Sequence, residues 1–186
     1  MKLKKINAVL SLLTVLAMLL HIGYSDYAYL TFYYNPGLKL LLSMPFMVLA
    51  CLHAVCGMTA VFMQSDGTRL DLYPKQNAGT IIQRVSAALI LPLLFLHINT
   101  FNLLKACAEG GKWLFFGLLI FAQLLFYADV LAHAAVSLSR AFITLGWLSS
   151  REKQKRIDRA AVIVCAVIFL ASAFAVVKGQ FAMFVH

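Results

Sequence analysis

Charged residues are scarce in this sequence, and no long polar stretch separates its apolar segments. Only 16 Lys and Arg and 7 Asp and Glu occur among 186 residues, whereas 62% of the residues are apolar. The charged share is about half that of a typical soluble domain, and the apolar runs reach the roughly 20 residues needed to cross a bilayer. The composition excludes an ordinary soluble domain and predicts an integral membrane protein.

Several signatures of soluble chemistry are also missing. The chain has no Gly-rich phosphate loop, no Ser-His-Asp arrangement and no internal repeat. Its four cysteines have neither Cys-x-x-Cys nor zinc spacing and are interpreted as small apolar fillers: Cys51, Cys56, Cys107 and Cys165. We expect no soluble catalytic domain and no nucleic-acid partner, because membrane topology explains most of the net charge of +9.

Five apolar segments predict an all-α membrane protein whose transmembrane helices form one bundle over residues 1–186. The predicted spans are 6–24, 40–63, 81–104, 113–138 and 160–177. The fourth apolar pattern continues until the charge run "REKQKR", so this helix is expected to protrude from the membrane. Turn-like segments punctuated by Gly or Pro are expected at residues 25–37, 65–79 and 107–112.

Basic residues outside the spans predict the orientation of the chain. One side carries Lys2, Lys4, Lys5, Arg69, Lys75, Arg151, Lys153, Lys155, Arg156 and Arg159, and the other carries Lys39, Lys105, Lys112 and Lys178. The positive-inside rule predicts a multi-pass protein of the cytoplasmic (inner) membrane, with the N-terminus cytoplasmic, the C-terminus outside and the basic side near anionic membrane lipid. No cleavable signal is expected, because the first apolar run lacks a small-residue cleavage site.

Histidine is distributed in an unusual way. Four of the five histidines lie within predicted spans, one in each of the first four: His21, His53, His97 and His133. Ionisable residues inside a membrane are costly and commonly functional. Imidazole is the usual axial ligand of a b-type haem, and a helical bundle can hold a haem between facing helices. We therefore expect a haem-binding bundle.

The depth of each histidine follows from a rise of about 1.5 Å per helical residue. His21 and His97 both lie about 23 Å from the cytoplasmic ends of their spans, close to the outer face. His53 and His133 lie about 20 and 30 Å from the outer ends of theirs, in the inner half of the membrane. We call His21 and His97 the outer pair and His53 and His133 the inner pair. Two pairs at two heights are what two stacked haems require.

Other polar residues near the spans have open interpretations. Arg84 and Arg140 are able to pair with haem propionates or to extend to lipid headgroups. Asp129 lies one helical turn before His133, where it is either a proton relay or a hydrogen-bonded structural group. The candidates for quinone binding near the outer face, which are equally typical of an interfacial belt, are Tyr24, Asp26, Tyr27, Asn99 and Asn102.

Three stretches carry a resemblance to a known family. They are "HAVCGMTAVF" at His53, "QNAGTIIQRVSAALILPLLFLH" leading to His97, and "AHAAVSLSRAFITLGW" with "KQKRID" after His133. Over residues 44–167 the chain resembles the five-helix, two-haem cytochrome b subunit of succinate dehydrogenases and fumarate reductases. The resemblance implies that the outer pair ligates a distal haem b and the inner pair a proximal haem b.

The same resemblance implies a function and partners. The chain is expected to lack a flavin of its own and to anchor a flavoprotein subunit and an iron–sulfur subunit on the cytoplasmic side. Electrons would pass between those subunits and membrane menaquinone or ubiquinone, for which this chain supplies the quinone site. The direction of the reaction and the identity of the soluble partners stay open.

Two other classes of protein are alternatives. The first is a haem-free small membrane transporter or assembly scaffold whose histidines bind substrate or protons. Transporters often show repeats and broken helices, whereas Pro45 and Pro92 are the only span breakers here and no repeat matches them. The second is the cytochrome subunit of nitrate reductases or hydrogenases, which places two ligands on one helix. The sequence places one histidine on each of four helices, which favours the two-haem anchor.

Overall fold

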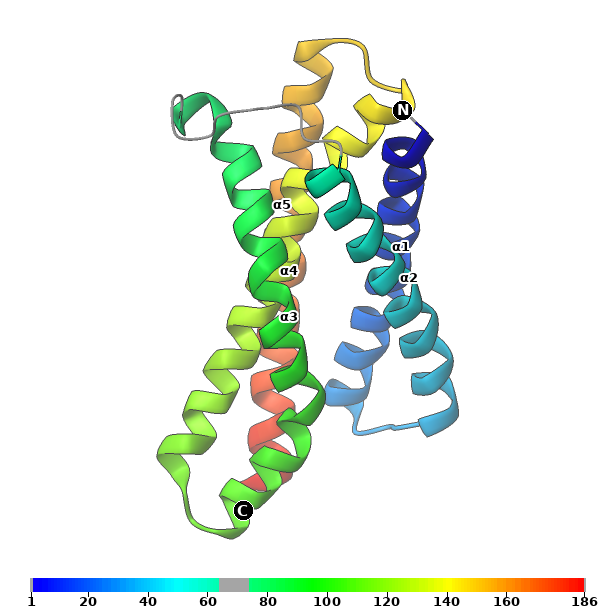
Figure 1. Ribbon diagram of the computed structural model, residues 1–186. Helices are drawn as coiled ribbons and strands as arrows, with labels where there is room; N and C mark the ends of the chain where they lie inside the picture. Colours follow the sequence, from blue (N-terminus) through cyan, green and yellow to red (C-terminus); the bar gives the residue numbers. More distant parts are fainter. Residues whose placement is uncertain (1, 64–73, 186) are drawn as a thin grey trace.

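The computed structural model describes residues 2–63 and 74–185, which form five helices (Figure 1). Their bounds are Lys2–Thr31 for α1, Pro36–Met63 for α2, Pro74–Glu109 for α3, Trp113–Leu145 for α4 and Arg151–Phe184 for α5. Each helix is long and apolar enough to cross a membrane. The prediction of an all-helical chain is confirmed for the described residues, in which five helices are long and apolar enough to span a membrane.

The helices are longer than the predicted spans. α1 continues to Thr31, through most of a segment for which the sequence predicts a turn. α5 begins at Arg151, so the charge run forms its first turns. Lys, Arg, Glu and Gln are good helix formers, and no Gly or Pro interrupts residues 25–31. Hydropathy therefore marks where the lipid ends, whereas a helix ends only where its backbone hydrogen bonds are interrupted.

Glycines end two of the helices. α3 runs to Glu109 and is followed by Gly111 with φ +64°, which reduces the predicted turn at residues 107–112 to its last residues. α4 reaches Leu145, as its extended apolar pattern predicts, and stops at Gly146 with φ +81°. A left-handed residue at this position is a common helix C-cap and favours glycine. The predicted turn at 65–79 lies mainly outside the described residues, and its last part belongs to α3.

The helices form an elongated bundle with the two termini at opposite ends (Figure 1). α4 is central, because it packs against α3, α5 and α1. α1 also packs against α5 and forms a hairpin with α2. Among the described residues, α2 packs extensively only against α1. The hairpin therefore adds to one flank of the α3–α4–α5 group, and α2 is the least enclosed helix.

The buried core is small for a chain of this length. One cluster joins Met18 of α1 to Leu131 and Ala134 of α4, and partly buried residues of α5 pack against it. A second cluster, nearer the C-terminus, joins Leu104 of α3 to Phe116 of α4. Most large apolar side chains are exposed instead, as expected for helices whose outer faces contact lipid rather than water.

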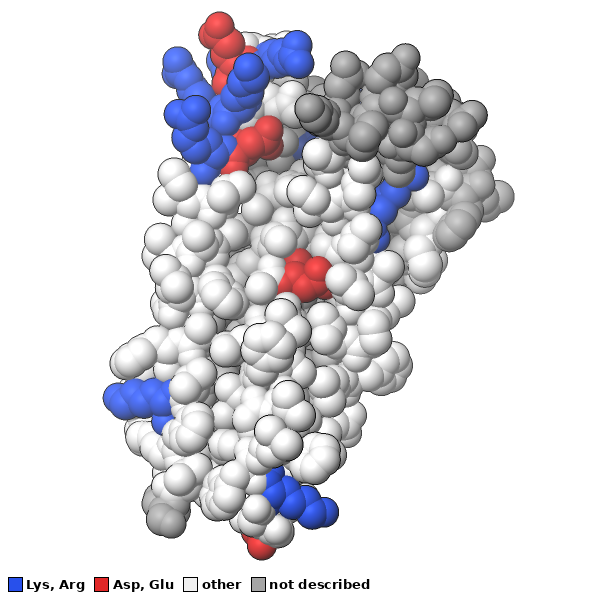
Figure 2. All heavy atoms as spheres, turned by 90° about the vertical axis from the view of Figure 1, so that its left-hand side faces the viewer, with Lys and Arg blue, Asp and Glu red and all other residues white. Residues whose placement is uncertain are grey.

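Charge is concentrated at the ends of the bundle. In Figure 2 the Lys and Arg side chains gather mainly at the upper end, with one further basic group on the right and others near the lower end, and one acidic patch lies in the otherwise largely uncharged middle. We call the upper end the basic end; it carries Lys2, Lys4, Lys5, Arg151, Lys153, Lys155, Arg156 and Arg159. The opposite, far end carries Lys39, Lys105, Lys112 and Lys178.

Candidate functional site

The inner pair is brought together. The rings of His53 on α2 and His133 on α4 have centroids 6.3 Å apart and are inclined at 66°. His53 lies ten residues before the end of α2, and His133 twelve residues before the end of α4. Both ends lie at the basic end, so the two histidines share one height more closely than the sequence arithmetic indicates. The difference shrinks because α2 begins at Pro36, four residues before the predicted span, whereas α4 begins at Trp113 as predicted.

Hydrogen bonds fix the tautomer of His133. Its Nδ1 lies 3.2 Å from the backbone carbonyl of Gln83 and 3.0 Å from Oγ of Ser86, both on α3. A carbonyl oxygen can only accept, so Nδ1 carries the proton and donates it. The Ser86 hydroxyl donates to the carbonyl of Ile82 at 2.7 Å, which leaves its lone pairs for the imidazole. Nε2 of His133 is therefore unprotonated, which is the form that binds a metal.

The two predicted propionate contacts differ in position. Arg140, seven residues beyond His133 on α4, donates a hydrogen bond to the side-chain carbonyl of Gln83. A Cβ atom at Gly79 of α3 would lie 2.9 Å from Nη2 of Arg140, so the glycine leaves room for the guanidinium. The Arg140 side chain is thus held between α3 and α4. Arg84 is exposed, as expected for a side chain that extends to headgroups.

The outer pair has a different setting. His21 on α1 accepts or donates a hydrogen bond between Nδ1 and Oγ of Ser43 at 3.1 Å, and its ring stacks on Phe46 of α2 at 5.6 Å. His97 on α3 stacks on Phe126 of α4 at 4.8 Å and meets Tyr127 edge-on at 5.7 Å. Each ring packs on a phenylalanine of the neighbouring helix.

One ring of each pair has a buried nitrogen without a partner. Among the described residues, Nδ1 of His53 and Nδ1 of His97 are buried and make no hydrogen bond. Their pair mates, His133 and His21, have Nδ1 bonded to a serine of an adjacent helix. An unsatisfied buried polar atom costs about 1–3 kcal/mol, so these imidazoles are unfavourable as purely structural residues. This pattern marks both pairs as functional candidates.

Asp129 has one carboxylate oxygen without a hydrogen-bond partner among the described residues. It occupies the middle of α4, and its Oδ2 is buried without a hydrogen bond among the described residues. Its side chain is partly exposed, one helical turn before His133. The structural role considered for Asp129 requires a hydrogen bond from a neighbouring helix, and Oδ2 receives none from the described residues. The relay role stays a prediction.

The five predicted quinone contacts do not converge on one site. The Tyr24 hydroxyl donates to the carbonyl of Asn35 at 2.9 Å and so anchors the α1–α2 connection. Asp26 accepts a hydrogen bond from Ser172 of α5 at 2.7 Å, inside the bundle. The remaining three residues are exposed: Tyr27, Asn99 and Asn102. The Asn99 amide donates a hydrogen bond to a carbonyl of its own helix.

Buried amides form a polar cluster that the sequence analysis misses. Gln123 of α4 and Gln180 of α5 are 3% and 0% exposed, and the Gln180 amide donates to the Gln123 carbonyl at 2.6 Å. Gln123 in turn donates to the hydroxyl of Tyr127 at 2.8 Å. A sequence signal exists, since both glutamines lie within long apolar runs. This signal is weak, because a neutral amide costs less inside an apolar helix than an ionisable side chain does.

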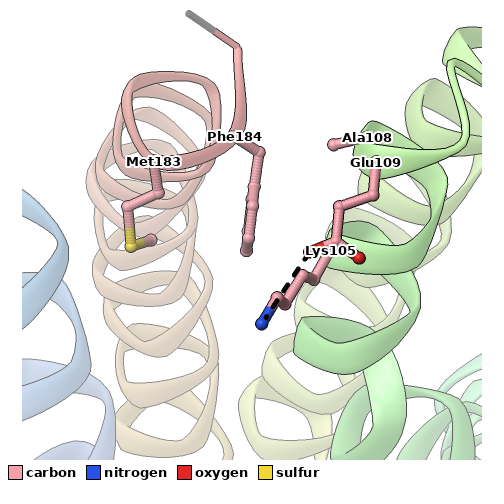
Figure 3. A pocket seen from close by; sticks show the side chains of 5 residues that line it. All are labelled: Lys105, Ala108, Glu109, Met183 and Phe184. Atoms are coloured by element: carbon pink, nitrogen blue, oxygen red, sulfur yellow. Dashed lines mark ion pairs between the residues drawn. The ribbon is translucent and has the colours of Figure 1, made fainter.

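A surface hollow lies at the far end between α3 and α5 (Figure 3). It encloses about 350 Å³ and is lined by Lys105, Ala108, Glu109, Met183 and Phe184. The amine of Lys105 and the carboxylate of Glu109 are 3.8 Å apart, one turn apart on α3 and largely exposed. None of the predicted site residues lines this hollow.

The arrangement of ligand-type residues is limited to pairs. Within residues 2–63 and 74–185, no group of three or more His, Cys, Asp or Glu side chains is placed to hold a metal ion. Comparisons with protein-family models, curated proteins and solved structures found no match to this chain. The functional conclusion therefore depends on the geometry of the two histidine pairs.

Proposed function

We propose that this chain is a dihaem cytochrome b, the membrane anchor subunit of a succinate:quinone oxidoreductase of the succinate dehydrogenase or fumarate reductase type. The observation that carries the proposal is the approach of His53 and His133 from two helices, with ring centroids 6.3 Å apart. A second pair of histidines lies farther along the same bundle. The sequence resemblance around three of the four histidines supports the same pairing.

The inner pair fits a haem iron in distance and in protonation. A bond between a metal and an imidazole nitrogen is about 2 Å long, so two axial imidazoles put their ring centroids about 6 Å apart. The observed 6.3 Å agrees with this requirement. The carbonyl of Gln83 holds the proton of His133 on Nδ1, which leaves Nε2 for the iron.

The pairing of histidines favours haem over a bare metal ion. A structural or catalytic zinc site takes three or four protein ligands, whereas a b-type haem needs only two axial imidazoles, because the porphyrin supplies the other four nitrogens. Two separate pairs on four helices match the second requirement.

Arg140 is the residue that we assign to a propionate of the inner haem. Its guanidinium lies between α3 and α4, near the basic end and on the helix that carries His133. Guanidinium–carboxylate pairs are strong and are often bidentate. Arg140 bonds the side-chain carbonyl of Gln83, and the backbone carbonyl of the same residue holds His133, so Gln83 would connect the propionate contact to the axial ligand.

The outer pair would hold the second haem. Ser43 fixes Nδ1 of His21, and the stacked rings of Phe46 and Phe126 restrict rotation of His21 and His97. Aromatic stacking of this kind also excludes lipid and water from the ligand faces.

Two bound haems would supply a one-electron relay between cytoplasmic redox subunits and membrane menaquinone or ubiquinone. This chain would contribute the axial ligands and the quinone site, whereas the flavin and the iron–sulfur clusters belong to a flavoprotein subunit and an iron–sulfur subunit. We assign those subunits to the basic end, which the positive-inside rule makes cytoplasmic. The exposed Arg151, Lys153 and Arg156 there offer positive charge to an acidic partner surface.

A reduced-minus-oxidised spectrum of the purified chain, combined with haem extraction, tests the proposal. We expect two b haems per chain, both low-spin with two histidine ligands. A preparation of folded chain without haem would contradict the proposal and favour the haem-free transporter or scaffold. One haem that is indifferent to His97→Ala would contradict the outer site alone.

A further inference from the structure

A chain of polar side chains that includes two buried glutamines runs from the outer pair through α5 to α1. It begins at Tyr127, whose ring meets the His97 imidazole edge-on at 5.7 Å. The Tyr127 hydroxyl accepts a hydrogen bond from Gln123 at 2.8 Å, and the Gln123 carbonyl accepts one from Gln180 at 2.6 Å. The second amide hydrogen of Gln180 points toward the hydroxyl of Tyr29 on α1, at 3.5 Å. We call these four residues the amide relay.

The amide relay requires a close approach of α1 and α5. A Cβ atom on Gly179 would lie 2.6 Å from the Tyr29 ring and 2.9 Å from its backbone carbonyl, so only glycine permits this spacing. The neighbouring Gln180 is completely buried and reaches both α4 and α1 from this point. Helices in lipid approach closely at small residues in this way.

We propose that the amide relay is a positioning device for the outer pair, an inference that rests on the proposed dihaem function. The relay holds the Tyr127 ring against His97 on one side and fixes the distance of α1 from α4 and α5 on the other. Because α1 carries His21, the same hydrogen bonds set both the orientation of the His97 ring and the position of its mate. Tyr127, Gln123 and Gln180 are thus positioning residues for the outer haem, and none of them is an iron ligand.

A hydrogen bond between helices can also serve adhesion alone. The chain offers a matched control for that role, because Ser172 of α5 donates to Asp26 of α1 at 2.7 Å and is 2% exposed. This bond joins the same two helices two turns away from Gln180 and includes no residue that contacts His97. Ser172→Ala removes one hydrogen bond between α1 and α5 while leaving the Tyr127–Gln123–Gln180 chain intact.

The test compares Tyr127→Phe, Gln180→Met and Ser172→Ala in the full chain with haem bound. We measure haem content, the midpoint potential of each haem and the low-spin electron paramagnetic resonance signal, which reports the orientation of the axial imidazoles. Tyr127→Phe keeps the ring and its volume, so we expect two haems, a displaced signal and potential for the outer haem, and an unchanged inner haem. Gln180→Met should displace the same outer signal, and it should do so more than Ser172→Ala, which keeps the chain from Tyr127 to Gln180.

A double-mutant cycle tests whether the residues of the amide relay act together on the outer haem or independently. Tyr127→Phe and Gln180→Met act on one hydrogen-bonded chain, so their effects on the outer potential should be smaller together than the sum of the two. Tyr127→Phe and Ser172→Ala should be additive. The positioning role is overturned if Tyr127→Phe leaves the outer signal unchanged. It is also overturned if Ser172→Ala displaces that signal as much as Tyr127→Phe does. In both cases the dihaem proposal stands. Wild-type chain without haem overturns both.

Discussion

The inner and outer halves of this bundle hold the same residue type in two different ways. In the inner half, His133 is held by a backbone carbonyl and a serine, and a guanidinium lies nearby. In the outer half, His21 and His97 stack on phenylalanines, and buried amides lie behind Tyr127. The inner setting is polar and includes a guanidinium, whereas the outer setting is mainly aromatic.

If both histidine pairs bind haem as proposed, this difference in their surroundings would give the two haems different redox properties. A proton held on Nδ1 by strong acceptors makes an imidazole a stronger donor to iron, and a nearby guanidinium stabilises negative propionate charge. Stacked aromatic rings control orientation and exclude water without adding charge. If the two pairs bind haems as proposed, the haems should differ in potential, and a change to the contacts of one pair should alter only the haem of that pair.

The largest expected effect concerns the inner ligands. His53→Ala and His133→Ala should each remove the inner haem, so that haem content falls by about half and the outer spectrum is retained. The measurement is haem content with redox titration of the purified variants. Asn99→Ala is the control, since Asn99 is exposed and bonds only to its own helix. Loss of different haems in the two histidine variants would disprove the inner pair.

Asp129→Asn should have the next largest effect. The amide keeps the shape of the side chain but cannot carry a proton, and general acid–base steps typically contribute about 10²–10⁴-fold to rate. If Asp129 is a relay, both haems should stay bound, quinone-linked turnover should fall by about that factor, and the pH dependence of the inner potential should disappear.

Asp26→Asn sharpens the result for Asp129. Asp26 is the carboxylate of the outer half and is already hydrogen-bonded by Ser172. Asp26→Asn should reduce turnover much less than Asp129→Asn does. An equal reduction would instead assign Asp26 to the quinone site. Normal turnover in Asp129→Asn with an unchanged pH dependence would reject the relay, and loss of the inner haem would make Asp129 a support for His133.

Arg140→Gln should weaken the inner haem without removing it. Hydrogen bonds to charged groups contribute about 1.5–3 kcal/mol, so inner haem should dissociate roughly 10- to 100-fold more readily. The rate of transfer to apomyoglobin measures this loss. Arg84→Gln is the matched control, because Arg84 is exposed one residue from Gln83, and it should not change the rate. Equal effects of the two variants would remove Arg140 from the haem site.

The smallest expected effect is that of Ser86→Ala. The variant removes one acceptor from Nδ1 of His133 while the carbonyl of Gln83 remains. A weaker hydrogen bond makes the imidazole a poorer donor to oxidised iron, so the inner potential should rise, by about 20 to 60 mV for a bond of about 0.5–1.5 kcal/mol. Ser43→Ala should change only the outer potential, because Ser43 bonds His21. If potentiometric titration shows that Ser86→Ala changes the outer potential and Ser43→Ala the inner potential, the two serines have been assigned to the wrong haems.

Particular residues show how far the sequence predicts the site. The inner pair follows from one histidine per span and a fixed rise per residue, and the structure brings those two rings together. Arg84 and Arg140 look alike in sequence, yet only Arg140 enters the bundle, where Gly79 leaves it space. Asp26 is predicted at the outer surface, but α1 continues as a helix and directs it to Ser172 of α5.

The sequence by itself predicted five segments apolar enough to cross a membrane and two approximate heights for the histidines, because hydropathy and a rise of about 1.5 Å per residue act along the chain. Only the tertiary structure decided which side chains meet across helices. The bond between Gln123 and Gln180, the carbonyl of Gln83 at His133 and the contact of Gly179 with Tyr29 depend on helix rotation and spacing. Packing of small residues and interhelical hydrogen bonds set these quantities, and neither is encoded in the periodicity of one segment.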